Sequence, residues 1–176
     1  QIIRKENDYE AMKALRKFCD ANNGFLRIKS RQKDPVKKYA AKMADKVLYD
    51  QEFYPSTVLK CFAVADIFFS FYSTGVMEAA IARVSSVCIA PAEQDWSDIQ
   101  GAQFKDLSQR GLFDWPGVSY LQTIPEIISG LAQKRISDFA FLAQEQAKYL
   151  QRFADGKIHG VAESIVLEIE KILQKE

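Results

Sequence analysis

The feature that most constrains the fold is the alternation of short apolar runs with segments of helical periodicity. The apolar runs lie at residues 25–28, 47–49, 67–71, 86–90 and 118–121, and helical stripes lie before, between and after them. Strands that alternate with helices are typical of a parallel sheet, because each right-handed crossover returns the chain to the same edge of the next strand. We therefore expect a Rossmann-like, three-layer α/β domain with a mostly parallel sheet.

Local signals refine this expectation. Asp34 and Pro35 have the residue types of an N-cap and a first helical position, so they predict a helix that starts there and runs to Ala44. The run 67–71 is almost wholly apolar, which predicts a strand buried on both faces. Residues 136–153 are expected to form one long helix, and a final helix is expected around the apolar stripe Val161, Ile165, Ile169 and Ile172.

Size and composition favour one compact domain that spans residues 1–176. The chain is 48% hydrophobic, and its 24 basic residues nearly balance its 23 acidic ones, so the overall charge does not indicate a nucleic-acid partner. The first helix begins near residue 6, where a doubly wound domain normally opens with a central strand. We therefore expect Gln1 to be an internal residue, and the chain to be the C-terminal part of a longer protein.

The cysteines and the hydropathy pattern predict a cytoplasmic protein. The three cysteines lie far apart among apolar neighbours, at Cys19, Cys61 and Cys88, which indicates reduced core residues. No apolar run approaches the roughly 20 residues that a transmembrane helix needs, so no transmembrane segment is expected. No cluster of metal-ligating residues is evident in the sequence, and we expect neither a bound metal nor a cofactor.

The turn after the run 67–71 is the leading candidate for a ligand site. Ligands of open α/β sheets bind beyond the carboxyl ends of the strands, and here Ser73, Thr74 and Gly75 precede a helix. Glycine allows a ligand to approach the backbone, and the amides of a helix N-terminus favour a phosphate. Glu78, one turn later, can accept hydrogen bonds from ribose hydroxyls. The competing interpretation is that the hydroxyl residues only cap the helix.

A basic loop after the first predicted strand is the second candidate. Arg31 and Lys33 follow the run 25–28, where their positive charges can neutralise a diphosphate. The alternative interpretation is a solvated basic loop, which is the more common role of such charge runs.

Residues 59–66 and 70–80 carry a family resemblance. The sequences LKCFAVAD and SFYSTGVMEAA resemble the C-terminal Rossmann-like domain of GT-B-type glycosyltransferases. The nearest likenesses are capsule and wall polysaccharide enzymes, among them CDP-glycerol glycerophosphotransferases. The resemblance implies that Ser73, Thr74 and Gly75 bind donor phosphates and that Glu78 binds the ribose. Many relatives have a basic residue and His-Pro in the first loop, where this chain has Asp34-Pro35, which leaves Arg31 and Lys33 as phosphate ligands.

The same resemblance implies an incomplete active site. GT-B enzymes consist of two such domains facing a cleft, and this chain would be one half of that architecture. The resemblance implies that the N-terminal lobe, which generally binds the acceptor, would be a separate part that this chain does not contain. The chain is thus expected to bind a nucleotide-diphosphate-linked donor, such as a nucleotide sugar, as part of a transferase whose catalytic residues are unknown. Two alternatives stay open: a domain like that of UDP-N-acetylglucosamine 2-epimerases, and a noncatalytic protein-interaction domain on the same fold.

Overall fold

The structure is a computed structural model that describes residues 5–50, 57–71, 73–91 and 111–154. Helices and strands alternate along the chain, as the sequence predicts. The strands are β1 (Arg27–Ser30), β2 (Lys46–Tyr49), β3 (Ile67–Ser70), β4 (Ser85–Ala90) and β5 (Ser119–Thr123). The α-helices are α1 (Lys5–Ala21), α2 (Lys38–Met43), α3 (Thr57–Phe62), α4 (Gly75–Ile81), α6 (Ile124–Gly130) and α7 (Ala143–Phe153). Short 3₁₀ helices, η2 (Leu131–Gln133) and η3 (Ile136–Phe139), follow α6. The terminal helix expected around Val161–Ile172 lies outside the described residues.

All strand pairs between these elements are parallel, which confirms the predicted α/β class. β4 lies between β3 and β5 in a three-stranded sheet, while β1 pairs with β2 alone. The described residues therefore form two parallel sheets, where the sequence suggested one. Side-chain packing joins them, because Ile28 of β1 and Phe69 of β3 contact the same apolar core.

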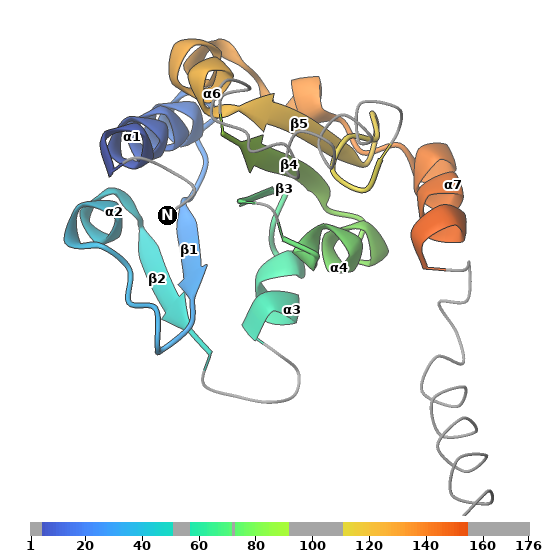
Figure 1. The fold of residues 1–176 in the computed structure, drawn as a ribbon, viewed down its shortest axis with the longest axis horizontal. Coiled ribbons are helices and arrows are strands. Elements are labelled where there is room, and N and C mark those ends of the chain that lie inside the picture. The colour runs from blue at the N-terminus through green and yellow to red at the C-terminus, as the bar shows by residue number, and fades with distance from the viewer. Residues whose placement is uncertain (1–4, 51–56, 72, 92–110, 155–176) are drawn as a thin grey trace, which may run out of the picture.

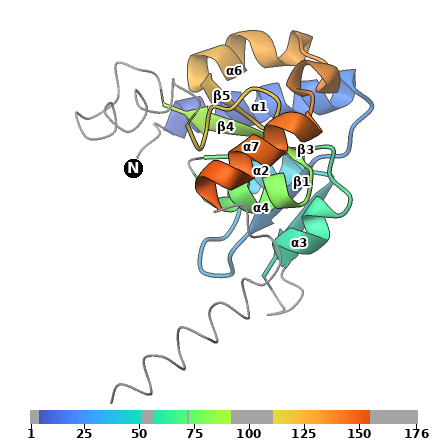
Figure 2. The same cartoon turned by 90° about the vertical axis from the view of Figure 1, so that its right-hand side faces the viewer.

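Helices cover both faces of the three-stranded sheet, which gives the three layers expected of a Rossmann-like domain. Figure 1 shows α1 and α6 on one side of β3, β4 and β5, and α3 and α4 on the other. Figure 2 shows the same arrangement from the side, with α7 beside α4. The core beneath α1 and α6 includes Val87 and Ile89 of β4, whereas Cys88, which points to the opposite face, packs against Val76 of α4. Within the described residues, no helix is both long enough and apolar enough to span a lipid bilayer.

β4, rather than β3, is the strand buried on both faces. All six residues of β4 are buried, whereas β3 has three half-buried residues followed by one buried residue. Among the described strands, β3 has a partner on one side only, so it is an edge strand and part of its surface stays accessible. The expectation for residues 67–71 was wrong in this respect, and Phe71 is 41% exposed.

The long helix expected over residues 136–153 is interrupted. Its first part is the 3₁₀ helix η3, its second part is α7, and the three residues between them are not helical. The Leu142 amide donates to the Gly117 carbonyl over 2.7 Å, and the Tyr120 hydroxyl donates to the Ala140 carbonyl, also over 2.7 Å. These bonds to the segment around the start of β5 take the place of helical bonds, so tertiary contacts override the local helical pattern.

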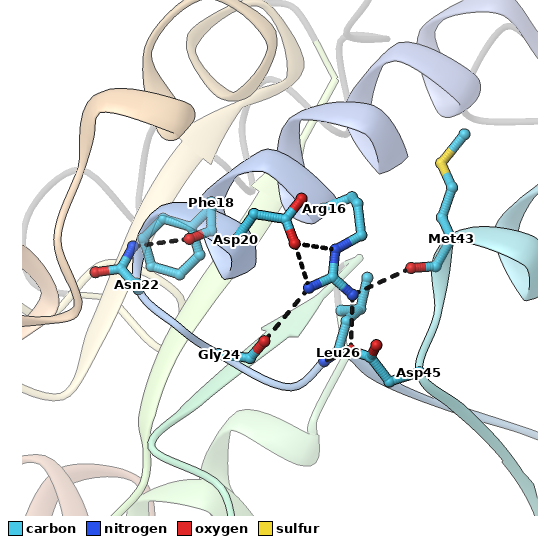
Figure 3. Close-up of polar contacts among 8 residues, drawn as sticks. All are labelled: Arg16, Phe18, Asp20, Asn22, Gly24, Leu26, Met43 and Asp45. Atoms are coloured by element: carbon cyan, nitrogen blue, oxygen red, sulfur yellow. Dashed lines mark hydrogen bonds and ion pairs between the residues drawn. The ribbon is translucent and has the colours of Figure 1, made fainter.

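The side chain of Arg16 on α1 connects α1 to the amino ends of β1 and β2 (Figure 3). Its guanidinium donates to the Gly24 and Met43 carbonyls over 3.3 Å each, and to Asp45 Oδ2 over 2.7 Å. The same carboxylate oxygen accepts from the Leu26 amide at 2.7 Å. The hydrogen bond from Arg16, with that from Leu26, holds the pKa of the Asp45 carboxyl below its usual value. The guanidinium of Arg16 thus joins α1 to the end of α2 and to the segments that lead into β1 and β2.

Replacing this cation by an apolar side chain is expected to destabilise the fold. Arg16→Met should lower the free energy of unfolding by about 1–3 kcal/mol, because partly buried carbonyls and a carboxylate lose a charged donor. The lowered pKa of Asp45 means that its ionised form stabilises the fold, and this stabilisation is lost as the pH falls through the pKa in the folded state. The difference in stability between the parent and Arg16→Met should therefore be smaller in acid. Urea unfolding of both proteins at pH 7 and pH 3 measures both effects.

Lys13→Met is the matched control, since Lys13 lies on the same helix and pairs with Glu10 in a half-exposed ion pair of 3.1 Å. Its effect should stay within about 0.5 kcal/mol. Equal losses for the two substitutions would contradict the connecting role of Arg16.

Candidate functional site

The candidate site lies where β3 ends and α4 begins. Gly75 is the first residue of α4, as the sequence predicts, and β3 ends at Ser70. The Gly75 amide donates to Ser73 Oγ over 3.1 Å, and the Val76 and Met77 amides donate to the carbonyls of Ser73 and Thr74. The hydroxyl oxygen of Ser73 therefore satisfies the first amide of α4, although the N-cap position belongs to Thr74. Among the described residues the Ser73 hydroxyl donates no hydrogen bond, so this group can still donate to a ligand.

Gly75 is closely packed against neighbouring side chains. A Cβ atom here would lie 3.2 Å from Ser73 Oγ and 3.4 Å from Cζ of the Phe68 ring. The first distance is tighter than most contacts of a Cβ atom, so the Ser73 side chain would have to shift slightly, whereas the second is at the edge of ordinary van der Waals contact. The missing side chain lets the start of α4 lie against the face of β3 that carries Phe68.

Ser70 is the site residue that sequence reasoning missed. Strand alternation places its side chain on the same face as Phe68, toward α4, and its register partner Cys88 packs against Val76 in the first turn of that helix. Ser70 is 8% exposed, and its hydroxyl has no hydrogen-bond partner within the described part of the chain. The signal in the sequence is one hydroxyl residue at the end of an apolar strand, IFFS, on the face that a helix covers.

Thr74 and Glu78 are both exposed at the start of α4. Thr74 has helical backbone angles and makes no capping bond with its side chain. Glu78 lies in the first turn of α4, and within the described residues its carboxylate forms no hydrogen bond or ion pair. A carboxylate with no protein partner on this exposed turn remains able to accept hydrogen bonds from a ligand.

Arg31 and Lys33 are exposed in a turn directly after β1. The Asp34 amide closes this turn by donating to the Arg31 carbonyl over 3.0 Å, and the Ser30 hydroxyl donates to the Asp34 carbonyl over 2.5 Å. Asp34 and Pro35 thus belong to the turn, and the prediction that they start α2 was wrong because Ser30 holds Asp34 there. No hydrogen bond or ion pair links Arg31 or Lys33 to α4 in the described ranges, and their approach to Gly75 stays a prediction.

A half-buried acid lies in the segment that precedes β5. Asp114 accepts from the Leu121 amide of β5 at 3.4 Å, and Leu121 packs in the same apolar cluster as Val76 of α4. Burial raises the pKa of the Asp114 carboxyl, and the bond from Leu121 opposes this only in part. Sequence reasoning missed this residue because no local signal distinguishes a single acid between Phe113 and Trp115.

The start of α4 can bind an anion. The groups around it are of the kinds that bind nucleotides in proteins. The site offers the hydroxyls of Ser70, Ser73 and Thr74 beside a glycine, and one turn away the carboxylate of Glu78, to which no described residue is bonded. Comparisons of the chain with protein-family models, with curated proteins and with solved structures found no match. The family resemblance therefore rests on the sequence motifs alone.

Proposed function

We propose that this chain is the donor-binding domain of a nucleotide-sugar-dependent or CDP-glycerol-dependent transferase of surface polysaccharide synthesis. The observation that carries the proposal is the buried hydroxyl of Ser70, which has no partner in the described residues and lies at the carboxyl end of β3, on the face that α4 covers. A buried hydroxyl without a partner costs about 1–3 kcal/mol, so such a group is expected to have a partner that the chain alone does not provide. A phosphate oxygen beside Gly75 would be such a partner.

The roles of the other residues follow from their chemistry. Ser73 and Thr74 donate hydroxyl hydrogen bonds to the donor phosphates, and Gly75 lets the phosphate approach the backbone. Glu78 accepts from the ribose hydroxyls. Arg31 and Lys33 approach the diphosphate from the neighbouring loop and neutralise its charge.

The reaction is displacement at the sugar or glycerophosphoryl group. The leaving nucleotide phosphate gains negative charge as its bond breaks, and donors fixed around it stabilise that charge in the transition state. In this proposal the acceptor and the catalytic base come from a second lobe that faces this domain. The domain alone is therefore expected to bind the donor without transferring it.

Replacing Ser70 distinguishes a nucleotide-binding role of its hydroxyl from a purely structural one. Ser70→Ala should weaken binding of the nucleotide by about 1.5–3 kcal/mol, roughly 10-fold to 150-fold, because a hydrogen bond to a charged phosphate is lost. Stability should stay the same or rise, since the substitution removes a buried hydroxyl without a partner. Isothermal titration with UDP and CDP, together with thermal melts, measures both quantities.

Ser86→Ala is the matched control, because Ser86 is also buried without a partner but lies near the amino end of β4. It should leave nucleotide affinity unchanged. The proposed role of Ser70 fails if the two alanine variants bind nucleotide equally well.

Glu78 offers an independent test of the ribose contact. Glu78→Ala should cost about 1.5–3 kcal/mol of binding free energy, tens-fold or more in affinity. The stability change should be small, about 0.3–1 kcal/mol, because an exposed carboxylate in the first turn acts only through the helix dipole. The capping interpretation predicts that small stability loss with unchanged nucleotide affinity. Glu10→Ala on α1 serves as the control for removing a glutamate elsewhere.

A further inference from the structure

An exposed aromatic ring lies at the carboxyl end of β3. Phe71 follows the last residue of the strand, Ser70, and its side chain is 41% exposed. Four residues separate β3 from Gly75, the first residue of α4, and Phe71 is the first of these four. The ring therefore belongs to the same short connection that carries hydroxyls of the proposed nucleotide site.

Phe71 differs in its packing from the other two phenylalanines of this segment. The Phe68 ring packs edge-to-face on Phe62 with 5.0 Å between the ring centroids, and the Phe69 ring packs on Phe18 at 5.6 Å. Within the described residues, the ring of Phe71 has no aromatic or cationic partner and belongs to none of the apolar core clusters. Packing of the domain thus accounts for two of the three rings but not for the third.

A planar ring in this position suits a nucleobase. Ligands of parallel sheets bind beyond the carboxyl ends of the strands, which is where Phe71 lies. Every nucleobase has a π-face, and aromatic side chains bind nucleobases by stacking on that face. A single exposed apolar residue needs no explanation on an arbitrary surface. Here, however, the ring lies in the connection whose hydroxyls are proposed to bind the phosphates, so phosphate and base contacts would come from one segment of the chain.

We propose that Phe71 stacks on the nucleobase of the donor. This proposal rests on the proposed nucleotide site and adds the base contact that Ser70, Ser73, Gly75 and Glu78 do not supply. Stacking depends on the π-face that all bases share and not on their hydrogen-bonding edges. Phe71 is therefore expected to contribute equally to the binding of UDP and CDP, and the choice between these two bases must come from other residues.

Replacements of Phe71 that differ in planarity test the proposal by isothermal titration of the full chain. Phe71→Leu keeps an apolar side chain but removes the ring, and it should weaken binding of UDP and CDP by roughly 5-fold to 150-fold, the range for the loss of one stacked base. Phe71→Tyr keeps the ring and should bind both nucleotides within about twofold of the parent. Ribose 5-phosphate has no base, so its affinity should be the same for the parent and for both variants.

Phe71→Trp provides a spectroscopic measurement of the same contact. The fluorescence of an indole at position 71 should be quenched when UDP is added, because the base stacks on it, but not when ribose 5-phosphate is added. The parent chain, whose two tryptophans lie elsewhere in the sequence, gives the background signal.

Phe25→Leu is the matched control, because Phe25 is also an exposed phenylalanine but lies before the amino end of β1. It should leave nucleotide affinity unchanged, and thermal melts establish that all variants fold. The proposal is overturned if Phe71→Leu binds UDP and CDP as tightly as the parent, or if it loses affinity for ribose 5-phosphate to the same extent. Either result leaves the proposed function standing. If the parent binds none of UDP, CDP and GDP, the proposed function fails, and this proposal fails with it.

Discussion

The guanidinium of Arg16 is the contact on which the arrangement of the domain most depends. The β1–β2 pair has no backbone bonds to the three-stranded sheet in the described residues, so side chains must fix its position. Arg16 does this at the amino ends of both strands through Asp45 and the Gly24 carbonyl. Edge-to-face packing of Phe18 on α1 against Phe69 of β3, with ring centroids 5.6 Å apart, connects α1 to the other sheet. α1 therefore positions the turn after β1 relative to the end of β3.

The carboxyl end of β3 combines features that stability alone does not explain. Glycine at position 75 lets α4 begin close to the side chains of Ser73 and Phe68, and the buried hydroxyl of Ser70, on the face of β3 that α4 covers, has no partner in the described residues. Alanine at position 70 would fill the same space without a buried polar group. Such local costs are frequent at functional sites, and although Ser85 and Ser86 carry the same cost near the amino end of β4, Ser70 lies at the carboxyl end of a strand, where ligands of parallel sheets bind. This trade between stability and binding is the physical basis of the proposed nucleotide site.

The sequence predicts the α/β class and the start of α4 well, because both follow from periodicity and from local glycine and hydroxyl signals. It fails where distant groups compete with local preference. Ser30 holds Asp34 in a turn instead of a helix cap, and the Gly117 carbonyl binds the Leu142 amide and interrupts a helical segment. Ser70 was missed because its significance depends on the absence of a partner, which a sequence does not reveal.

Direct titration of the parent chain with nucleotide-linked donors tests the central claim, that this domain binds a donor without its second lobe. UDP-N-acetylglucosamine, CDP-glycerol and a GDP-linked sugar cover the three donor classes. Isothermal titration should show saturable one-site binding of one of them, with a Kd below about 1 mM, equivalent to about −4.1 kcal/mol. The absence of saturable binding for all three donors would contradict the account and favour a noncatalytic interaction domain on the same fold.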